Sequence, residues 1–210
     1  MFFYPMFRTN PKAFVRILHA SPDAPAVDIY ANDQPLVKNL KYKEFTEYLD
    51  VPAGTYNIKV YPTGTKSTPV INTNLDLNSE TISTIAAIGK VSDIELLPIN
   101  DPILPRDPSK TYIRFAHLSP NTPSVDITLP DRTVIFQDVS FKEVTEYAAV
   151  NPGRYTLQAR PTGSSDVALT VPNVLLKPNR FYTVYAVGLN GENPPLQVLI
   201  PMDGNTYIEF

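Results

Sequence analysis

The feature that most constrains how this chain folds is an internal repeat. Residues 14–29 align without a gap with residues 112–127, and residues 82–89 match residues 181–188 further along. The pairs of identical residues in the first match are Arg16/Arg114, His19/His117, Ser21/Ser119, Pro22/Pro120, Pro25/Pro123, Val27/Val125, Asp28/Asp126 and Ile29/Ile127. Similarity this dense at a fixed spacing indicates duplication. We therefore expect two copies of one domain.

The length of the chain agrees with this division, because 210 residues suit two domains of roughly 100 residues each. The expected boundaries are an N-terminal aromatic arm at 1–12, repeat 1 at 13–100, a Pro-rich linker at 101–110 and repeat 2 at 111–210. The prolines in and around the linker favour a stiff, extended path. Limited freedom between the domains follows, with Ile103 and Leu104 as candidates to pack between them.

Within each copy the apolar residues alternate with a period of two, which is typical of β-strands. Tyr56, Ile58 and Val60 show the pattern in the first copy, and residues 82–88 form a nearly continuous apolar run that predicts a central strand buried on both sides. The Asn32-Asp33 pair predicts a tight hairpin after the second strand. We count seven or eight short strands per copy and predict an all-β fold of two tandem immunoglobulin-like antiparallel β-sandwich domains.

Composition excludes several classes of function. The net charge is −3 and no basic run occurs, so nucleic acid is not an expected partner. Cysteine is absent, which removes disulfides and thiolate metal sites. No window reaches the ~18 apolar residues of a transmembrane segment. The apolar start lacks a basic region, and Arg8 and Pro11 cut it short of a signal peptide, so either the general secretory route is not used or a leader has been removed.

Residues 19–30, HASPDAPAVDIY, resemble the hallmark of a bacterial family of domains of unknown function, and residues 52–56 and 62–64 match it as well. The second copy departs from the pattern at Asn121, Thr122 and Asn151. The resemblance implies tandem domains in secreted or cell-wall proteins, with no catalytic residues to carry over. The Gly-Thr-Tyr element is also similar to a turn of transthyretin-like sandwiches. Deposition on a spore surface from the mother cell would need no leader.

His19 and His117 are the two histidines, one in each copy. Each is either a metal ligand or general base, or a buried imidazole bonded to the backbone of the proline-rich loop that follows. A transition-metal site needs three or four ligands, so we favour the buried imidazole and predict no metal or cofactor. Ser21, His19 and Asp23 suggest a catalytic triad by composition, but a turn formed by Ser-Pro-Asp explains them better.

The repeated charged residues suggest a cross-strand ion pair. If the first two strands pair antiparallel around Pro22, Arg16 lies opposite Asp28, and Arg114 lies opposite Asp126 in the second copy. The carboxylates of Glu44 and Glu47, with Glu143 and Glu146, are interpreted as a solvated edge strand, since alternate residues point to opposite sides and do not share one glycosidase-like cleft.

Aromatic residues raise two further alternatives. A row of tyrosines is a candidate platform for stacking sugars: Tyr30, Tyr42, Tyr48, Tyr61, Tyr147, Tyr182 and Tyr185. The arm residues Phe2, Phe3, Tyr4 and Phe7 either fold back across the first domain or add to a sheet edge or groove of a neighbouring molecule.

Together these patterns favour a protein that is not an enzyme: a structural or adhesive module of a bacterial cell or spore surface. Its partners are then a second copy of itself, a surface protein or a glycan. A glycan- or peptide-binding module is the alternative, and a hydrolase is the weakest one.

Overall fold

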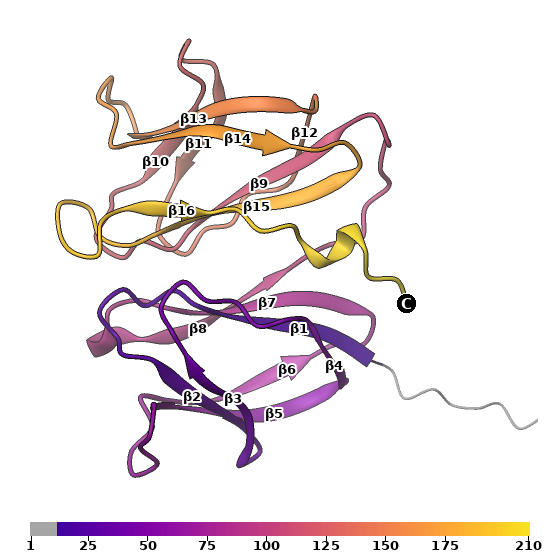
Figure 1. Ribbon diagram of the computed structural model, residues 1–210, viewed down its shortest axis with the longest axis vertical. Helices are drawn as coiled ribbons and strands as arrows, with labels where there is room; N and C mark the ends of the chain where they lie inside the picture. The colour runs from indigo at the N-terminus through magenta and orange to yellow at the C-terminus, as the bar shows by residue number, and fades with distance from the viewer. Residues whose placement is uncertain (1–11) are drawn as a thin grey trace, which may run out of the picture.

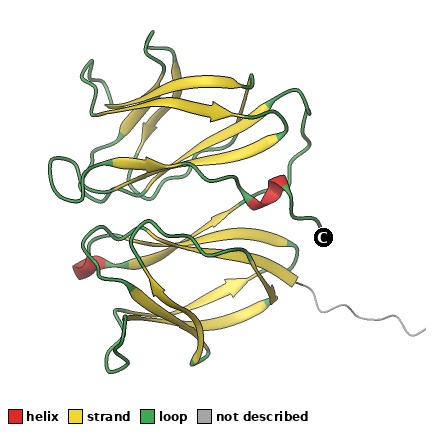
Figure 2. Ribbon diagram, in the orientation of Figure 1, coloured by secondary structure: helices red, strands yellow, loops and turns green. Residues whose placement is uncertain are grey.

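The structure is a computed structural model that describes residues 12–210. Figure 2 shows that this part of the chain is built mainly from strands. Its two short 3-10 helices are η1 (Val91–Asp93) and η2 (Gly204–Thr206). No helix among the described residues is long and apolar enough to cross a membrane.

Each half of the chain has eight strands. Those of the first half are β1 (Lys12–His19), β2 (Val27–Ala31), β3 (Gln34–Leu40), β4 (Leu49–Pro52), β5 (Gly54–Pro62), β6 (Ile71–Leu77), β7 (Thr81–Ile88) and β8 (Glu95–Asn100). Those of the second half are β9 (Thr111–His117), β10 (Val125–Thr128), β11 (Val134–Val139), β12 (Ala148–Val150), β13 (Gly153–Pro161), β14 (Leu169–Leu176), β15 (Arg180–Val187) and β16 (Gln197–Leu199).

The strands form four sheets of four. In the first domain the orders are β4-β1-β7-β8 and β3-β2-β5-β6, and in the second they are β12-β9-β15-β16 and β11-β10-β13-β14. The predicted tandem β-sandwiches are therefore confirmed. The expectation of purely antiparallel sheets needs correction, because β1 pairs parallel with β7 and β9 pairs parallel with β15.

Figure 1 shows the four sheets as successive layers, with the sheets of β1 and β9 facing each other in the middle. One apolar core fills the first sandwich, around Val27 and Val60, and another fills the second, around Val125 and Leu157. A third cluster contains residues of both domains, including Leu18, and lies between the two middle sheets. The sandwiches are thus packed on each other by their sheet faces.

This stacking explains the continuous apolar run of β7. Ile85 and Ala87 point into the core of the first sandwich, while Ala86 and Ile88 point into the cluster between the domains. Burial on both sides, as predicted for a central strand, results from one face inside the domain and one face against its twin.

The predicted hairpin at Asn32-Asp33 is confirmed. Both residues have positive φ, 49° and 64°, which two-residue hairpin turns of type I′ require. They connect β2 to β3 and set the edge of the outer sheet.

Candidate functional site

Arg16 is the first element of a buried site between the two domains. It lies on β1 and points away from the core of its own domain, with 4% of its surface exposed. Its Nη2 donates to Oδ1 of Asp203 at 2.8 Å, its Nη1 to the Met202 carbonyl at 2.9 Å and its Nε to Thr84 Oγ1 at 2.8 Å. Asp203 follows the last strand of the other domain and is fully buried. The ion pair therefore crosses the domain boundary.

Arg114, on β9, makes the same contacts in the opposite direction. Its Nη2 donates to Oδ1 of Asp101 at 2.5 Å, its Nη1 to the Asn100 carbonyl at 2.6 Å and its Nε to Thr183 Oγ1 at 2.7 Å. Asp101 follows β8, the last strand of the first domain. Each domain thus supplies an arginine to the aspartate that ends its twin.

Two tyrosines connect the ion pairs. The hydroxyl of Tyr48 donates to Oδ2 of Asp101 and that of Tyr147 donates to Oδ2 of Asp203, both at 2.7 Å. Each aspartate consequently binds an arginine from one domain and a tyrosine from the other. We refer to Arg16, Arg114, Asp101, Asp203, Tyr48 and Tyr147 as the junction network. The network has approximate two-fold symmetry, which exchanges one domain with the other.

Apolar and aromatic groups surround the network. The guanidinium of Arg16 lies 4.9 Å from the ring centroid of Phe45 and 4.8 Å from that of Tyr48. The guanidinium of Arg114 lies 4.5 Å from the centroid of Tyr147. Tyr185, fully buried, lies against the Phe45 ring and within the apolar cluster between the domains. Such surroundings strengthen electrostatic attraction and make an unpaired charge costly.

Burial also shifts the acid–base equilibria of the network. Desolvation and the nearby charge of Asp203 raise the pKa of Asp101 to about 6, although Arg114 acts in the opposite direction. Desolvation raises the pKa of the Tyr48 and Tyr147 phenols above the usual range, so both remain hydrogen-bond donors. The network holds charge between the two domains. Beside it lies an open pocket of about 300 Å³, whose lining includes Arg114 and Tyr147 of the network together with Asn100, Pro102 and Glu146.

The predicted pairing of Arg16 with Asp28 is wrong. β1 and β2 lie in different sheets, so the supposed hairpin around Pro22 does not form. Asp28 Oδ1 instead accepts a hydrogen bond from Asn39 N at 2.8 Å and one from Thr63 Oγ1 at 3.0 Å.

The same correction applies to Arg114 and Asp126 in the second domain. Asp126 Oδ1 accepts from Asp138 N at 2.8 Å and lies 3.3 Å from Thr162 Oγ1. In both copies this aspartate ties the edge strand to a Pro-Thr-Gly turn and has no role in an ion pair across the first two strands.

The two histidines occupy the buried positions that were predicted. Nε2 of His19 lies 2.9 Å from the Pro25 carbonyl, and Nε2 of His117 lies 3.2 Å from the Pro123 carbonyl. Both side chains are fully buried, and desolvation lowers the pKa of each ring. Each imidazole bonds its proline-rich loop through Nε2, while Nδ1 is buried without a hydrogen-bond partner among the described residues.

The structure does not assemble Ser21, His19 and Asp23 into a triad. His19 Nε2 faces a carbonyl, and Asp23 Oδ1 accepts a hydrogen bond from Val91 N at 2.8 Å. Ser119, the counterpart of Ser21, donates to the Gly188 carbonyl at 2.7 Å. The Ser-Pro-Asp segment is a bend that Asp23 holds against the start of η1, and the Ser21 hydroxyl is buried without a hydrogen-bond partner among the described residues.

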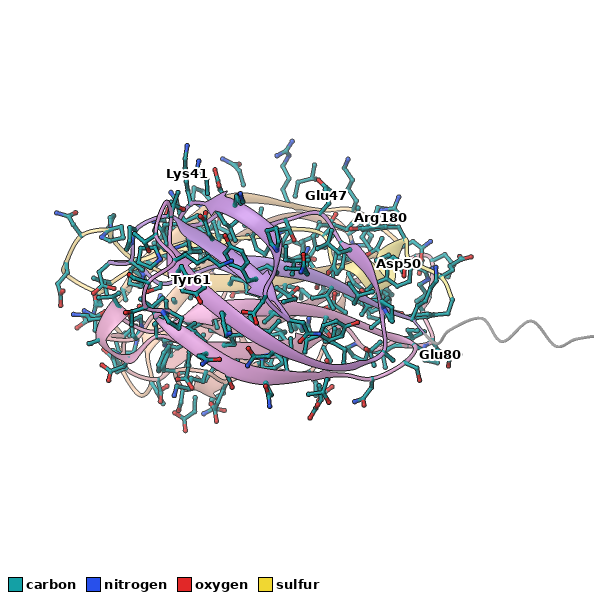
Figure 3. The ribbon with its side chains drawn as sticks, turned by 90° about the horizontal axis from the view of Figure 1, so that it is seen from below. Lys41, Glu47, Asp50, Tyr61, Glu80 and Arg180 are labelled. Carbon is teal, nitrogen blue, oxygen red and sulfur yellow. The ribbon has the colours of Figure 1, made fainter. Side chains whose placement is uncertain are left out.

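The predicted edge strand at Glu44 and Glu47 is replaced by a turn and a single bridge. Glu44 Oε2 accepts from Lys41 N at 2.8 Å. The segment lies along β1 through a bridge between Leu18 and Phe45 and through backbone hydrogen bonds, such as that from Thr46 N to the Ile17 carbonyl at 2.9 Å. β4 begins just beyond it. Glu47 is exposed and points outward in Figure 3. In the second domain, Glu143 Oε2 likewise accepts from Ser140 N, and Glu146 is exposed.

The candidate sugar platform is not present. None of its seven tyrosines is exposed: Tyr30, Tyr61 and Tyr185 are buried, and the others are half-buried.

The expected packing of two linker residues also fails. Ile103 and Leu104 do not pack between the domains, because they are 63% and 37% exposed.

Two remaining predictions concern metals and the arm. Among residues 12–210, no group of three His, Cys, Asp or Glu side chains is placed to hold a metal ion. Phe2, Phe3, Tyr4 and Phe7 lie outside the described residues.

The sequence interpretation missed the acidic half of the junction network. The sequence pattern suggested Tyr48 and Tyr147 only as stacking residues of a sugar platform, not as hydrogen-bond donors to buried aspartates. Asp101 and Asp203 lie beyond the last match, where the loop before β16 is longer than its counterpart. Extending the alignment past this length difference would have paired them.

A search among curated proteins finds no match. Among solved structures, one described as "Alpha-glucan binding by a streptococcal virulence factor" is 9% identical, covering 94% of this chain and 100% of that chain, with a TM-score of 0.25. Likeness at this level carries no argument about fold or ligand.

A family model describes most of the sequence. The model of DUF4397, a domain of unknown function, matches twice in tandem, at residues 13–128 and 128–206. The first match continues beyond β8 and through β10, so it spans the junction described above. The two matches leave little of the chain unassigned. This chain belongs to the DUF4397 family.

Proposed function

We propose that this chain is a non-catalytic structural or adhesive module of a bacterial cell or spore surface. The observation that carries the proposal is the junction network. Arg16, Arg114, Asp101 and Asp203 are at most 4% exposed and are fully engaged in joining the domains. A polar cluster that binds a substrate keeps part of its hydrogen-bonding capacity free for it. Here the hydrogen bonds hold the two sandwiches in a fixed relative orientation, which suits a spacer or scaffold.

Exposed apolar side chains near the junction support self-association. Ile103, Met202, Tyr207 and Phe210 are 63%, 37%, 54% and 52% exposed, and they come from the linker and the C-terminal tail. Asn205 Nδ2 donates to the Pro102 carbonyl at 2.9 Å, which holds these two segments together. Exposed apolar residues gathered in one region are typical of interaction surfaces.

The start of β1, the first described strand, lies close to this tail. Phe14, near the start of β1, packs edge-on against Phe210 with ring centroids 5.5 Å apart. An arm that carries Phe2, Phe3, Tyr4 and Phe7 therefore begins beside apolar groups that are already exposed. Addition of the arm to a neighbouring copy is the assembly that we propose.

The test is the molar mass of the full chain and of residues 12–210, measured by light scattering after size-exclusion chromatography. We expect higher oligomers for the full chain and a monomer for the shortened one. Identical elution as monomers would contradict assembly through the arm.

The non-catalytic part of the proposal is tested with ester, glycoside and phosphate model substrates. We expect no turnover above background. Turnover that disappears in the His19→Gln or His117→Gln variant would overturn the proposal in favour of a hydrolase. Specific hits on a glycan array would favour the binding-module alternative.

A further inference from the structure

An apolar cavity of about 80 Å³ lies between the two sheets of the first domain. Its walls come from strands of both sheets, and every lining side chain is a hydrocarbon except Tyr56. The hydroxyl of Tyr56 donates to the Pro52 carbonyl at 2.8 Å, so its hydrogen bond is made elsewhere. A cavity without polar partners does not hold ordered water, and it selects apolar occupants.

The second domain provides an internal comparison, because it has the same fold with different side chains. A cavity of about 20 Å³ lies between its sheets, displaced toward His117 and Val125. Its lining includes Phe115, where the first domain has Ile17. Phe115 is 1% exposed and fills space that the smaller Ile17 leaves open. Leu129 likewise packs against the second core at the position of Ala31. The larger cavity is therefore particular to the first copy.

The cavity reaches the surface along one side of the sandwich. Leu36, on edge strand β3, is 37% exposed, and Leu49, on edge strand β4, is half-buried. Both line the cavity, and each belongs to the strand that ends its sheet. A molecule can enter between these edges while a polar end stays in water.

We propose that this cavity binds the end of an unbranched alkyl chain. Its volume is about half that of the ~150 Å³ apolar cavity known to accept benzene, which favours a slender chain over a ring. Burial of methylene groups against Val15, Ile17 and Ile85 supplies the affinity. The open edge between Leu36 and Leu49 leaves the head group in water. This inference does not depend on the proposed structural role.

The experiment uses the full chain with labelled isoleucine methyl groups and 1-hexanol as the probe, followed by NMR. We expect saturable shifts at the methyls that line the cavity, those of Ile29, Ile58 and Ile85. The Ile17→Phe variant copies the second domain, so its affinity for the probe is expected to fall at least tenfold while its melting temperature is unchanged or higher.

A reciprocal variant controls for a loss of binding that comes only from disturbed folding of the Ile17→Phe variant. Phe115→Ile enlarges the cavity of the second domain, and we expect new shifts at Ile127, which lines it. No saturable shift in the unmodified chain, or equal binding by Ile17→Phe, would overturn the proposal. Binding that appears only after residues 1–11 are deleted would also overturn it, and would assign the cavity to the N-terminal segment of the chain.

Discussion

At the scale of single residues, two buried ion pairs between the domains are the positions most sensitive to loss of a partner. Arg16 and Asp203 have 5% and 0% of their side chains exposed, so each charge depends on the other and on neighbouring donors. A buried ion pair contributes modestly to the free energy of unfolding. A buried charge without its partner lowers that free energy strongly, because nothing offsets the cost of its desolvation. The duplicate pair, Arg114 with Asp101, obeys the same rule.

The Arg16→Met variant therefore leaves Asp203 buried without its partner. We expect a loss of about 3–5 kcal/mol in the free energy of unfolding. The matched control is Lys12→Ala, since the Lys12–Asp50 pair has 54% and 43% of its side chains exposed. Breaking that pair is expected to cost ~0–1 kcal/mol. Urea denaturation of both variants measures the difference, and equal costs would show that the junction pair is energetically unimportant.

At the scale of elements, β7 and β15 are each followed by a glycine that the next turn requires. Gly89 and Gly188 have φ of 87° and 92°, in the left-handed region that favours glycine. A Cβ on Gly188 would lie 2.2 Å from the Pro195 carbonyl oxygen, and one on Gly89 would lie 2.6 Å from that of Asp93. Each central strand is therefore followed by a turn pressed against backbone of the same domain.

Gly188→Ala is expected to destabilise the protein more than Gly163→Ala does. Both positions have positive φ, but a Cβ at Gly163 meets nothing within 4 Å. The backbone conformation alone costs the Gly163 variant about 1–2 kcal/mol, and the clash with backbone adds to this in the Gly188 variant. Thermal unfolding by circular dichroism compares them. Equal melting temperatures would mean that the loop moves aside at no cost.

At the scale of the whole molecule, the junction makes stability depend on pH. Asp101 has a pKa of about 6 in the folded protein, above its ordinary value of 3.8. The folded state therefore binds more protons than the unfolded state between these two values. The contribution of Asp101 to stability is fully present below pH 3.8 and is lost as the pH rises through 6.

The Asp101→Asn variant has no proton to exchange at this position. We expect its free energy of unfolding, measured in urea at pH 4.5 and pH 7, to fall less with rising pH than that of the unmodified chain. The two buried histidines titrate in both proteins, so their effect cancels in the comparison. The same pH slope in both proteins would contradict a raised pKa at Asp101.

Local patterns along the chain were sufficient for the fold class. Alternation in β5 and the hairpin at Asn32-Asp33 follow from period-two burial and from positive φ, which are properties of neighbouring residues. The duplication was also predictable, because the repeated residues show it directly. The burial of the two histidines was predictable because a repeated residue that lacks partners for catalysis most often has a structural role.

The pairing of distant segments was decided by tertiary structure. The period-two pattern correctly places Arg16 on the face of β1 that points away from the core of its own domain. Its partner Asp203, however, comes close only when the two sandwiches stack sheet on sheet. Sequence proximity suggested Asp28 instead, because a hairpin is the shortest way to join two strands. The cavity beside Ile17 is likewise a property of packing, since its volume depends on side chains from strands of both sheets. Periodicity determines which side of a strand is buried, whereas only the folded chain determines what covers it.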